Sequence, residues 1–331
     1  MQTIILNNKP KLVSCASIAG KKENDGNVSQ YFDAIILDGR YGKKSWEEAE
    51  SQMQKDAAFM VLHKTQNKAE DIDCIFGGDL LNQCMGTSFG ATQLNIPFFG
   101  IYGACSTFCE GLILSSIFVD GGYGKKVMCT SSSHFCTSER QFRFPLEYGG
   151  QRAPAAQWTV TAAGAALVSD EGSNIEITAV TPGKVIDAGI SDAANMGAAM
   201  APAAVDTIKT HFRDRGLEND YFDMVVTGDL GKYGYSIAKE LLGKDGIELS
   251  DRFYDCGAMI YKENQDTHAG GSGCGCCASV FSGYIFDMLK KGKIDKVLLV
   301  ATGALMSTTS AFQGNSIPGV AHAVSIERVR R

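Results

Sequence analysis

A cysteine at the start of an apolar segment is the residue whose type and position best suit chemistry. Cys105 follows a glycine turn at Gly103 and precedes Ser106, Thr107 and a run of apolar residues. This pattern predicts a helix that begins at Cys105, and the free backbone N–H groups at a helix start stabilise a thiolate or a bound anion. Cys105, Ser106 and Thr107 are therefore candidates for a nucleophile or an anion cradle. The alternative is a core thiol without a chemical role.

A polar stretch follows the predicted strand 127–130, at a position where α/β proteins place ligand contacts. It contains a histidine, which titrates near neutral pH, and arginines, which bind carboxylates through paired hydrogen bonds. The candidate binding residues of this stretch are Ser133, His134, Arg140, Gln141 and Arg143. The alternative is a solvated surface on which the arginines pair with Glu139 or Glu147.

A glycine-rich segment, residues 270–277, leads into another predicted helix. Its cysteines stand at adjacent or alternate positions, whereas zinc sites use separated pairs of ligands, so no metal site is predicted. The segment also lacks the Lys-Ser/Thr ending of a phosphate loop and does not match the dinucleotide fingerprint. It predicts a backbone turn that approaches a ligand closely, with Ser272 and Gly273 as candidate contacts.

Four other polar positions are notable. Asp79 and Asp229 end equivalent predicted strands, and this repetition favours a structural role such as capping. Asn82 follows only Asp79, so it is a candidate for a function specific to one half of the chain. His322 precedes the last predicted strand and is either a buried, hydrogen-bonded histidine or a ligand contact.

An internal repeat has to position these residues. Residues 46–80 align without a gap on residues 196–230, at a constant offset of 150, and both copies end in Gly-Asp-Leu. Each copy opens with apolar residues at helical spacing and then enters a short apolar strand. Two further helices, Cys105–Asp120 and Cys274–Lys291, each lead through a glycine turn into a strand. The final strands are predicted near 160–169 and 319–327.

The order strand, helix, strand, helix, strand, strand, given twice, predicts an α/β fold with helices covering a mostly parallel sheet. The helix after Cys105 is apolar nearly all round, so we expect it to be buried, with the two central helices packed together. The chain is predicted to form two duplicated halves, 1–170 and 171–331. Two unrelated Rossmann-like domains are the alternative.

Composition narrows the classes of function. The net charge is −6 and basic residues are scattered among acids, whereas nucleic-acid binding needs a concentrated basic surface. Many of the eleven cysteines lie in apolar segments, and the first residues lack the apolar stretch of a secretory signal, which together predict a reducing compartment. No apolar run approaches the roughly 18 residues that span a bilayer, so membrane association is expected to be peripheral.

Seven short stretches carry a resemblance to known proteins. They are 78–83 (GDLLNQ), 102–107 (YGACST), 139–145 (ERQFRFP), 147–151 (EYGGQ), 201–204 (APAA), 269–274 (AGGSGC) and 301–305 (ATGAL). Duplicated halves with a cysteine opening the first central helix resemble the thiolase superfamily. The stretches together resemble the stage V sporulation protein AD family over essentially the whole chain. The resemblance implies a thiolase-like α/β fold in which two βαβαββ halves form α-β-α-β-α layers.

The resemblance also implies a function. Members of this family bind dipicolinic acid and support its uptake into the spore, and its release, together with membrane subunits of the same channel. It implies a peripheral protein of the spore or forespore inner membrane, and likeness to thiolases implies a homodimer formed through the sheet of the first half. No cofactor is implied, and calcium as a companion of the ligand is left open.

The chain departs from the condensing enzymes of the superfamily. Those enzymes pair the cysteine with histidine and asparagine, or with histidine and a second cysteine. This chain has Gly228-Asp229-Leu230 and Gly271-Ser272-Gly273 where such partners are expected. A cysteine without a base and an oxyanion donor is a weak acyl-transfer catalyst, so we expect a non-catalytic binding protein. The alternative is an acyltransferase or condensing enzyme with Cys105 as nucleophile and His322 or Cys274 as its partner.

Dipicolinate is a flat pyridine with two carboxylates, and its pocket needs anion donors at two points and an apolar wall. The start of the Cys105 helix with the polar stretch after it, and the glycine-rich turn, are the candidate donors, and Phe142 or Tyr148 is the candidate wall. The candidate ligand-binding residues are Cys105, Ser106, Thr107, Asn82, Ser133, His134, Arg140, Gln141, Arg143, Tyr148, Ser272, Gly273 and His322.

Overall fold

A computed structural model gives the arrangement of residues 1–142 and 151–330. The elements of the first half are β1 (Ile4–Ile5), β2 (Lys11–Gly20), α1 (Lys21–Asn24), β3 (Ala34–Ile36), α2 (Trp46–Thr65), β4 (Cys74–Gly78), α3 (Met85–Ala91), β5 (Phe98–Gly100), α4 (Thr107–Asp120), β6 (Lys126–Ser133), α5 (Phe135–Phe142), β7 (Trp158–Thr159) and β8 (Ala162–Ser169). Those of the second half are β9 (Ile175–Thr181), α6 (Met196–Arg215), β10 (Met224–Thr227), α7 (Gly231–Lys244), β11 (Phe253–Asp255), α8 (Cys256–Ile260), β12 (Gly271–Ser272), α9 (Cys274–Val280), the π-helical turn η7 (Phe281–Ile285), α10 (Phe286–Lys290), β13 (Lys296–Ala304), α11 (Thr308–Phe312) and β14 (Gly319–Arg328).

Each half of the chain builds a half-sheet of the same topology. The strand orders are β5-β4-β6-β8-β2 in the first half and β11-β10-β13-β14-β9 in the second. In each, the first three strands are parallel and the last two pairings are antiparallel. The sheet is therefore mixed rather than mostly parallel. The last strand of each half, β8 or β14, runs back between two neighbours, and antiparallel pairing needs no crossover helix.

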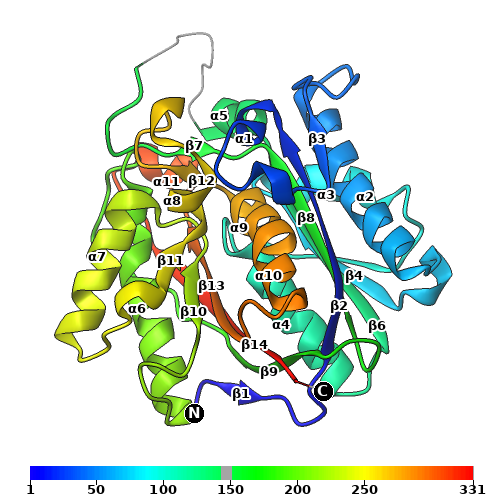
Figure 1. Ribbon diagram of the computed structural model, residues 1–331. Helices are drawn as coiled ribbons and strands as arrows, with labels where there is room; N and C mark the ends of the chain where they lie inside the picture. The colour runs from blue at the N-terminus through cyan, green and yellow to red at the C-terminus, as the bar shows by residue number, and fades with distance from the viewer. Residues whose placement is uncertain (143–150, 331) are drawn as a thin grey trace.

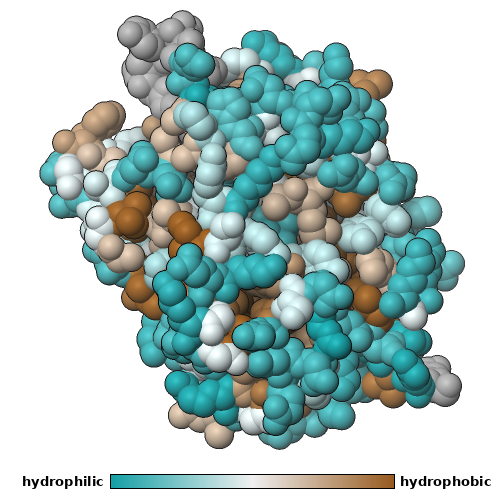
Figure 2. Space-filling view, turned by 60° about the vertical axis from the view of Figure 1, so that its left-hand side comes forward, coloured by the Kyte–Doolittle hydropathy of each residue, from teal (hydrophilic) through white to brown (hydrophobic). Residues whose placement is uncertain are grey.

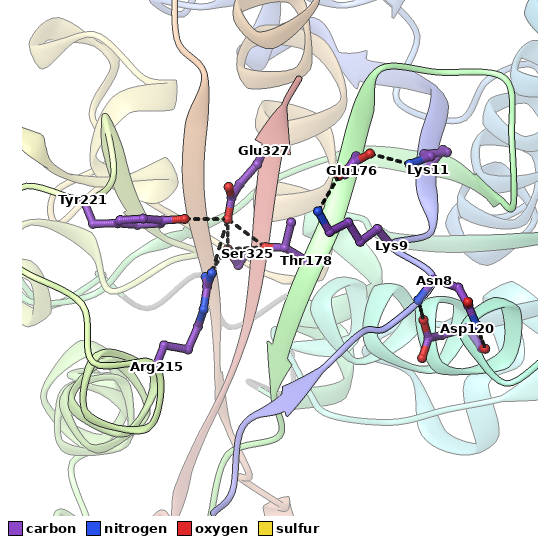
Figure 3. Close-up of polar contacts among 10 residues, drawn as sticks. All are labelled: Asn8, Lys9, Lys11, Asp120, Glu176, Thr178, Arg215, Tyr221, Ser325 and Glu327. Atoms are coloured by element: carbon purple, nitrogen blue, oxygen red, sulfur yellow. Dashed lines mark hydrogen bonds and ion pairs between the residues drawn. The ribbon is translucent and has the colours of Figure 1, made fainter. Parts of the chain in front are cut away.

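The half-sheets join at the pair formed by Lys11 of β2 and Glu176 of β9. Lys11 Nζ donates a hydrogen bond of 2.5 Å to Glu176 Oε1, and Lys9 Nζ lies 3.6 Å from the other carboxylate oxygen (Figure 3). On the next strand, Glu327 of β14 lies 3.4 Å from Arg215 of α6, which ties the outer helix to the sheet. Ionic contacts thus reinforce the seam where the two halves meet.

Helices form three layers around the two half-sheets. α2 covers the outer face of the first half-sheet and α6, with α7 against it, covers the second, while α4, α9 and α10 lie between them (Figure 1). α4 contacts both β6 and β13, so it belongs to the interior of both halves. This arrangement confirms the predicted α-β-α-β-α layers.

The two central helices pack against each other as predicted. Phe108 of α4 and Phe281 after α9 are fully buried, and their ring centroids lie 5.8 Å apart. The helices differ from prediction in two details. α4 begins at Thr107, so Cys105 lies in the turn before it, and the expected continuous helix Cys274–Lys291 is interrupted by the π-helical turn Phe281–Ile285.

The repeat is visible in side-chain contacts as well as in topology. α2 and α6 each span 20 residues and start 150 residues apart. Asp73 Oδ2 accepts hydrogen bonds from the N–H groups of Lys125 and Lys126 at 2.7 and 2.9 Å. Asp223 Oδ2 accepts equivalent hydrogen bonds of 2.7 and 2.9 Å from residues 295 and 296. Each aspartate therefore fixes the turn that leads into the central strand of its half.

One face of the molecule is mostly polar. Figure 2 shows a face on which hydrophilic residues predominate and apolar residues form small, separate patches. In the parts of the chain that the structure describes, no helix combines the length and apolar character needed to cross a bilayer. The eleven cysteines are all unpaired thiols, and ten of them are buried.

Candidate functional site

Cys105 lies in a tight turn between β5 and α4, and the turn is held by its own side chains. Ala104 has a left-handed backbone with φ of 51°. Ser106 Oγ donates to Gly103 O and Thr107 Oγ1 donates to Ala104 O, both at 2.7 Å. The hydroxyls of Ser106 and Thr107 therefore stabilise the turn, and the Cys105 side chain, in a residue 6% exposed, faces the second half of the protein.

The second half supplies the groups opposite Cys105. Cys105 Sγ lies 4.0 Å from Ser272 Oγ, which donates to Asp229 Oδ2 at 3.0 Å. The Gly273 N–H donates to the same oxygen at 2.9 Å, and Thr302 Oγ1 donates to the other carboxylate oxygen at 2.8 Å. Asp229, just after β10, thus holds both the glycine-rich turn and β13 around the thiol.

The glycine-rich turn depends on a close approach to β6. Gly273 has φ of 103°, and a Cβ at this position would lie 2.6 Å from Ser133 Oγ. Ser133 Oγ donates to Val160 O at 2.7 Å and accepts from Gly275 N–H at 3.1 Å. Ser133 therefore supports the turn from the side of the first half, and only glycine fits at position 273.

Burial keeps the Cys105 thiol neutral. Desolvation raises the pKa of Cys105 well above its usual value, and the neighbouring Asp229 carboxylate raises it further, against a smaller opposing effect of Ser272. Desolvation also raises the pKa of Asp229. A catalytic cysteine needs the opposite environment, because the thiolate is the nucleophile and cationic or basic neighbours are what stabilise it.

A narrow cavity of about 40 Å³ lies in front of Cys105, with room for a few water molecules. Its wall is contributed by both halves and combines hydroxyl and amide groups with apolar side chains. The lining residues are Leu80, Tyr102, Ala104, Cys105, Ser138, Glu139, Phe142, Gln157, Thr159, Met196, Ser272, Ala304 and Met306.

Two polar residues of the lining differ in how they are satisfied. Gln157 Nε2 donates to Asp229 O at 2.8 Å and to Gly271 O at 2.7 Å, so it braces the turn. Ser138, on α5, is 3% exposed, and its hydroxyl has no hydrogen-bond partner among the described residues. Leaving a buried hydroxyl unpaired costs about 1–3 kcal/mol, which a ligand acceptor in the cavity would recover.

A buried acid anchors α5. Glu50 of α2 accepts from Ser132 Oγ at 3.2 Å, and its Oε2 lies 2.7 Å from Thr137 Oγ1. The single Thr137 hydroxyl hydrogen is also within reach of His134 O at 2.9 Å. If Thr137 donates to that carbonyl, Glu50 must be the donor to Thr137 and therefore protonated. Desolvation and the nearby Asp79 raise the pKa of Glu50 to about 8, which agrees with this direction.

Both candidate histidines and Arg140 point away from the cavity. His134 Nε2 lies 2.7 Å from Gly39 O, and burial lowers its pKa. His322 lies within β14 rather than before the last strand as predicted, and its Nδ1 accepts from Gly183 N–H at 3.0 Å. Burial lowers the pKa of His322 to about 4. Arg140 forms an ion pair with Glu47 at the start of α2.

The remaining candidates brace the rim of the cavity or lie elsewhere. Gln141 Nε2 donates to Leu80 O at 2.9 Å and its Oε1 accepts from the Asn82 N–H at 3.0 Å, so the two residues fasten the loop after β4 to α5. Arg143 and Tyr148 lie outside the described residues. Of the predicted set, Cys105 and Ser272 line the cavity, and ligand binding by any member stays a prediction.

Sequence reasoning did not find several residues that build the site. Asp229 was expected to be structural because it repeats Asp79. The repeat misled here because Asp79 accepts from the N–H groups of Leu81 and Thr87 and caps α3, whereas Asp229 turns toward Ser272. Pairing of β7 with β12 brings Thr159 beside Ser272, and no local sequence signal marks so short a ladder.

Comparisons with known proteins agree with this fold. The family model described as Stage V sporulation protein AD matches residues 1–327. The chain is 45% identical to stage V sporulation protein AD of Bacillus subtilis over 315 residues, which cover 95% of this chain and 93% of that protein.

Solved structures of similar fold include 3-oxoacyl-[acyl-carrier-protein] synthase III and OleA. The 3-oxoacyl-[acyl-carrier-protein] synthase III of Aquifex aeolicus superposes with a TM-score of 0.59 at 13% identity, over 96% of this chain and 99% of that chain. An OleA variant from Xanthomonas campestris gives 0.61 at 13% identity, over 98% and 99% of the two chains. At such identity the likeness shows the thiolase-like fold alone.

We expect Glu50→Gln to reduce the loss of stability that occurs as the pH rises from the usual carboxyl pKa of 4.5 toward about 8. The folded protein keeps the Glu50 proton up to about pH 8, where the unfolded chain has already lost it. The free energy of unfolding therefore falls as pH rises between the two pKa values, by at most about 1.4 kcal/mol per pH unit. Urea unfolding of wild type and variant from pH 5 to pH 8.5 measures the difference. Glu70→Gln, at an exposed position, is the control, and equal slopes in all three proteins would contradict the prediction.

Proposed function

The chain belongs to the stage V sporulation protein AD family, and on this premise we propose that it is a sporulation protein whose Cys105 cavity binds dipicolinic acid without catalysis. The proposal extends to a role in moving this acid into, and out of, the spore. The unpartnered hydroxyl of Ser138, buried in the wall of the cavity, is the observation that carries the assignment.

The lining offers complementary groups to a flat dicarboxylate. The hydroxyls of Tyr102 and Ser138, both in the first half, are the candidate donors to the ligand. Ser272 in the second half donates its hydrogen to Asp229, so its oxygen offers lone pairs only. Phe142 and Met306 supply apolar surface for the faces of a pyridine ring. The cavity of about 40 Å³ is smaller than such a ring, so binding requires side chains of the lining to move apart.

The charges around the cavity favour one of two forms of the ligand, the free dianion or its calcium chelate. The charged side chain of the described lining is the acid Glu139 rather than a cation. The Asp229 carboxylate lies just behind Ser272. The described lining contains no lysine or arginine that would face the carboxylates of a free dianion. We therefore propose that calcium accompanies dipicolinate, since a one-to-one chelate carries no net charge.

Ser138→Ala is expected to weaken dipicolinate binding by about tenfold, the effect of losing one hydrogen bond of about 1.4 kcal/mol. Isothermal titration calorimetry with dipicolinate, alone and with equimolar calcium, measures this change, and the affinity is expected to be higher with calcium. Ser191→Ala, at an exposed position, serves as the control. If Arg140→Ala lost affinity while Ser138→Ala retained it, the ligand would bind near Arg140 and not in the Cys105 cavity.

Catalysis is not part of the proposal because the described lining lacks a histidine, the usual base partner of a catalytic cysteine. All five histidines are described, and none of them lines the cavity. Burial and Asp229 favour the neutral thiol. We therefore expect incubation with acyl-coenzyme A thioesters to leave Cys105 unmodified in intact-mass spectrometry. A stoichiometric acyl adduct, absent from Cys105→Ser, would establish an acyl-transfer enzyme instead.

We also propose that the protein forms a homodimer and associates peripherally with membrane subunits at the inner spore membrane. The edge strand β5 supports the dimer, since it pairs only with β4 in the described chain and carries Phe99, which is 48% exposed. Light scattering is expected to give twice the chain mass of 35.4 kDa, and Phe99→Glu to give the monomer. A monomeric wild type, or recovery of the native protein from spores without membrane subunits, would contradict this assembly.

A further inference from the structure

A second and larger cavity lies at the opposite end of the first half-sheet from Cys105. Its volume is about 1180 Å³, and it is bounded by the start of β2, the start of β6, the end of α2 and the segment from η7 to α10. Cys105 instead lies beyond the carboxyl ends of β4 and β6. The two cavities are therefore separate, and we call the larger one the lysine groove after Lys64, Lys126, Lys290 and Lys291, which line it.

Two of these lysines are neutralised by carboxylates. Lys64 Nζ lies 2.6 Å from Asp33 Oδ1 and donates to Cys15 O at 2.7 Å. Lys291 Nζ lies 2.8 Å from Asp287 Oδ2, one turn before it on the same helix. These pairs fix the walls of the groove and leave little net charge.

The other two lysines have no such compensation. Lys126 Nζ donates to the neutral Asn67 Oδ1 at 2.7 Å. Lys290 Nζ lies 5.8 Å from the centroid of the Phe286 ring. Among the described residues neither lysine is within ion-pair distance of a carboxylate, and the remaining acid of the lining, Glu171, is exposed at the rim. The groove therefore contains two ammonium groups with donor capacity left over.

A buried hydroxyl in the same wall is also without a partner. Ser282 lies in the π-helical turn and is 3% exposed, and its Oγ makes no hydrogen bond with any described residue. Its neighbour Gly283 packs so closely on the turn at Tyr31 that a Cβ there would lie 2.7 Å from the Tyr31 carbonyl oxygen. π-helical turns often occur at functional sites, because the extra residue redirects side chains. Here the turn brings Ser282 into the lining.

We propose that the lysine groove binds a small polyanion that bears phosphate groups. Lysine binds phosphate as a point charge, whereas planar recognition of carboxylates is the property of arginine, and the described lining contains lysines and no arginine. Lys126 and Lys290 bind the anionic oxygens, and Ser282 donates its free hydroxyl. The ligand is either a free phosphorylated compound or the headgroup of an anionic phospholipid.

Titration of the full-length protein with inorganic pyrophosphate at low ionic strength tests the site. Wild type is expected to bind saturably, and Lys126→Met with Lys290→Met to lower the affinity at least tenfold. Lys21→Met with Lys239→Met removes the same charge from exposed positions outside the groove and is expected to leave the affinity unchanged. Absence of saturable binding, or an equal loss in both double variants, would overturn the proposal.

Ser282→Ala separates ligand binding from folding. Removing an unpartnered buried hydroxyl does not lower stability, so the thermal midpoint of this variant is expected to equal or exceed that of wild type. A several-fold loss of pyrophosphate affinity with this midpoint supports the role of Ser282. An unchanged affinity would show that the buried Ser282 hydroxyl does not bind the ligand, and this would overturn its part in the proposal.

Co-sedimentation with vesicles distinguishes the two sources of the phosphate. Binding to phosphatidylglycerol vesicles that pyrophosphate reverses identifies the headgroup, and pyrophosphate binding without co-sedimentation identifies a free ligand. Co-sedimentation that pyrophosphate does not reverse and that both double variants retain would overturn the proposal. Ser138→Ala is expected to bind pyrophosphate normally, so the outcome for the lysine groove is independent of the outcome for the Cys105 cavity.

Discussion

The buried carboxylate of Asp229 is the interaction on which the site depends. A carboxylate removed from water must find hydrogen-bond donors, and Asp229 finds them in Ser272, Gly273 and Thr302. These donors come from the glycine-rich turn and from β13, so their common acceptor sets the distance between the two segments. The groups that enclose Cys105 are therefore held in place by their hydrogen bonds to the Asp229 carboxylate. The same charge disfavours a second anion on the thiol sulfur.

Equivalent aspartates have different roles in the two halves. Asp79 accepts from the N–H groups of Leu81 and Thr87 and organises the start of the short helix α3. In the second half this task belongs to Asp255, which accepts from the N–H groups of Leu230 and Gly231 at the start of α7. Because Asp255 satisfies those groups, Asp229 is released to face Ser272. In the second half the acid on the neighbouring strand β11 therefore carries the capping task, and Asp229 forms part of the site.

The sequence predicted the architecture better than the site. Helical spacing and the repeated Gly-Asp-Leu located α2, α6 and the strands after them, because those patterns arise from burial along each element. The position of Cys105 before a buried helix was also predictable. The direction of His134 was not, since it is decided by Gly39, which is 95 residues away in the chain. Ser138 likewise gives no local sign that its hydroxyl lacks a partner.

The seam between the half-sheets has a consequence for the nascent chain. β2 is made early but pairs with β8, so the first half-sheet cannot close until Ser169 has left the ribosome. Even then the face of α4 that packs against the second half has no cover until α9 and β13 have been synthesised. Such long-range pairing slows folding, and the partly folded intermediates expose apolar surface that promotes aggregation. We therefore expect the first half to need protection from aggregation during translation until the last strands are complete.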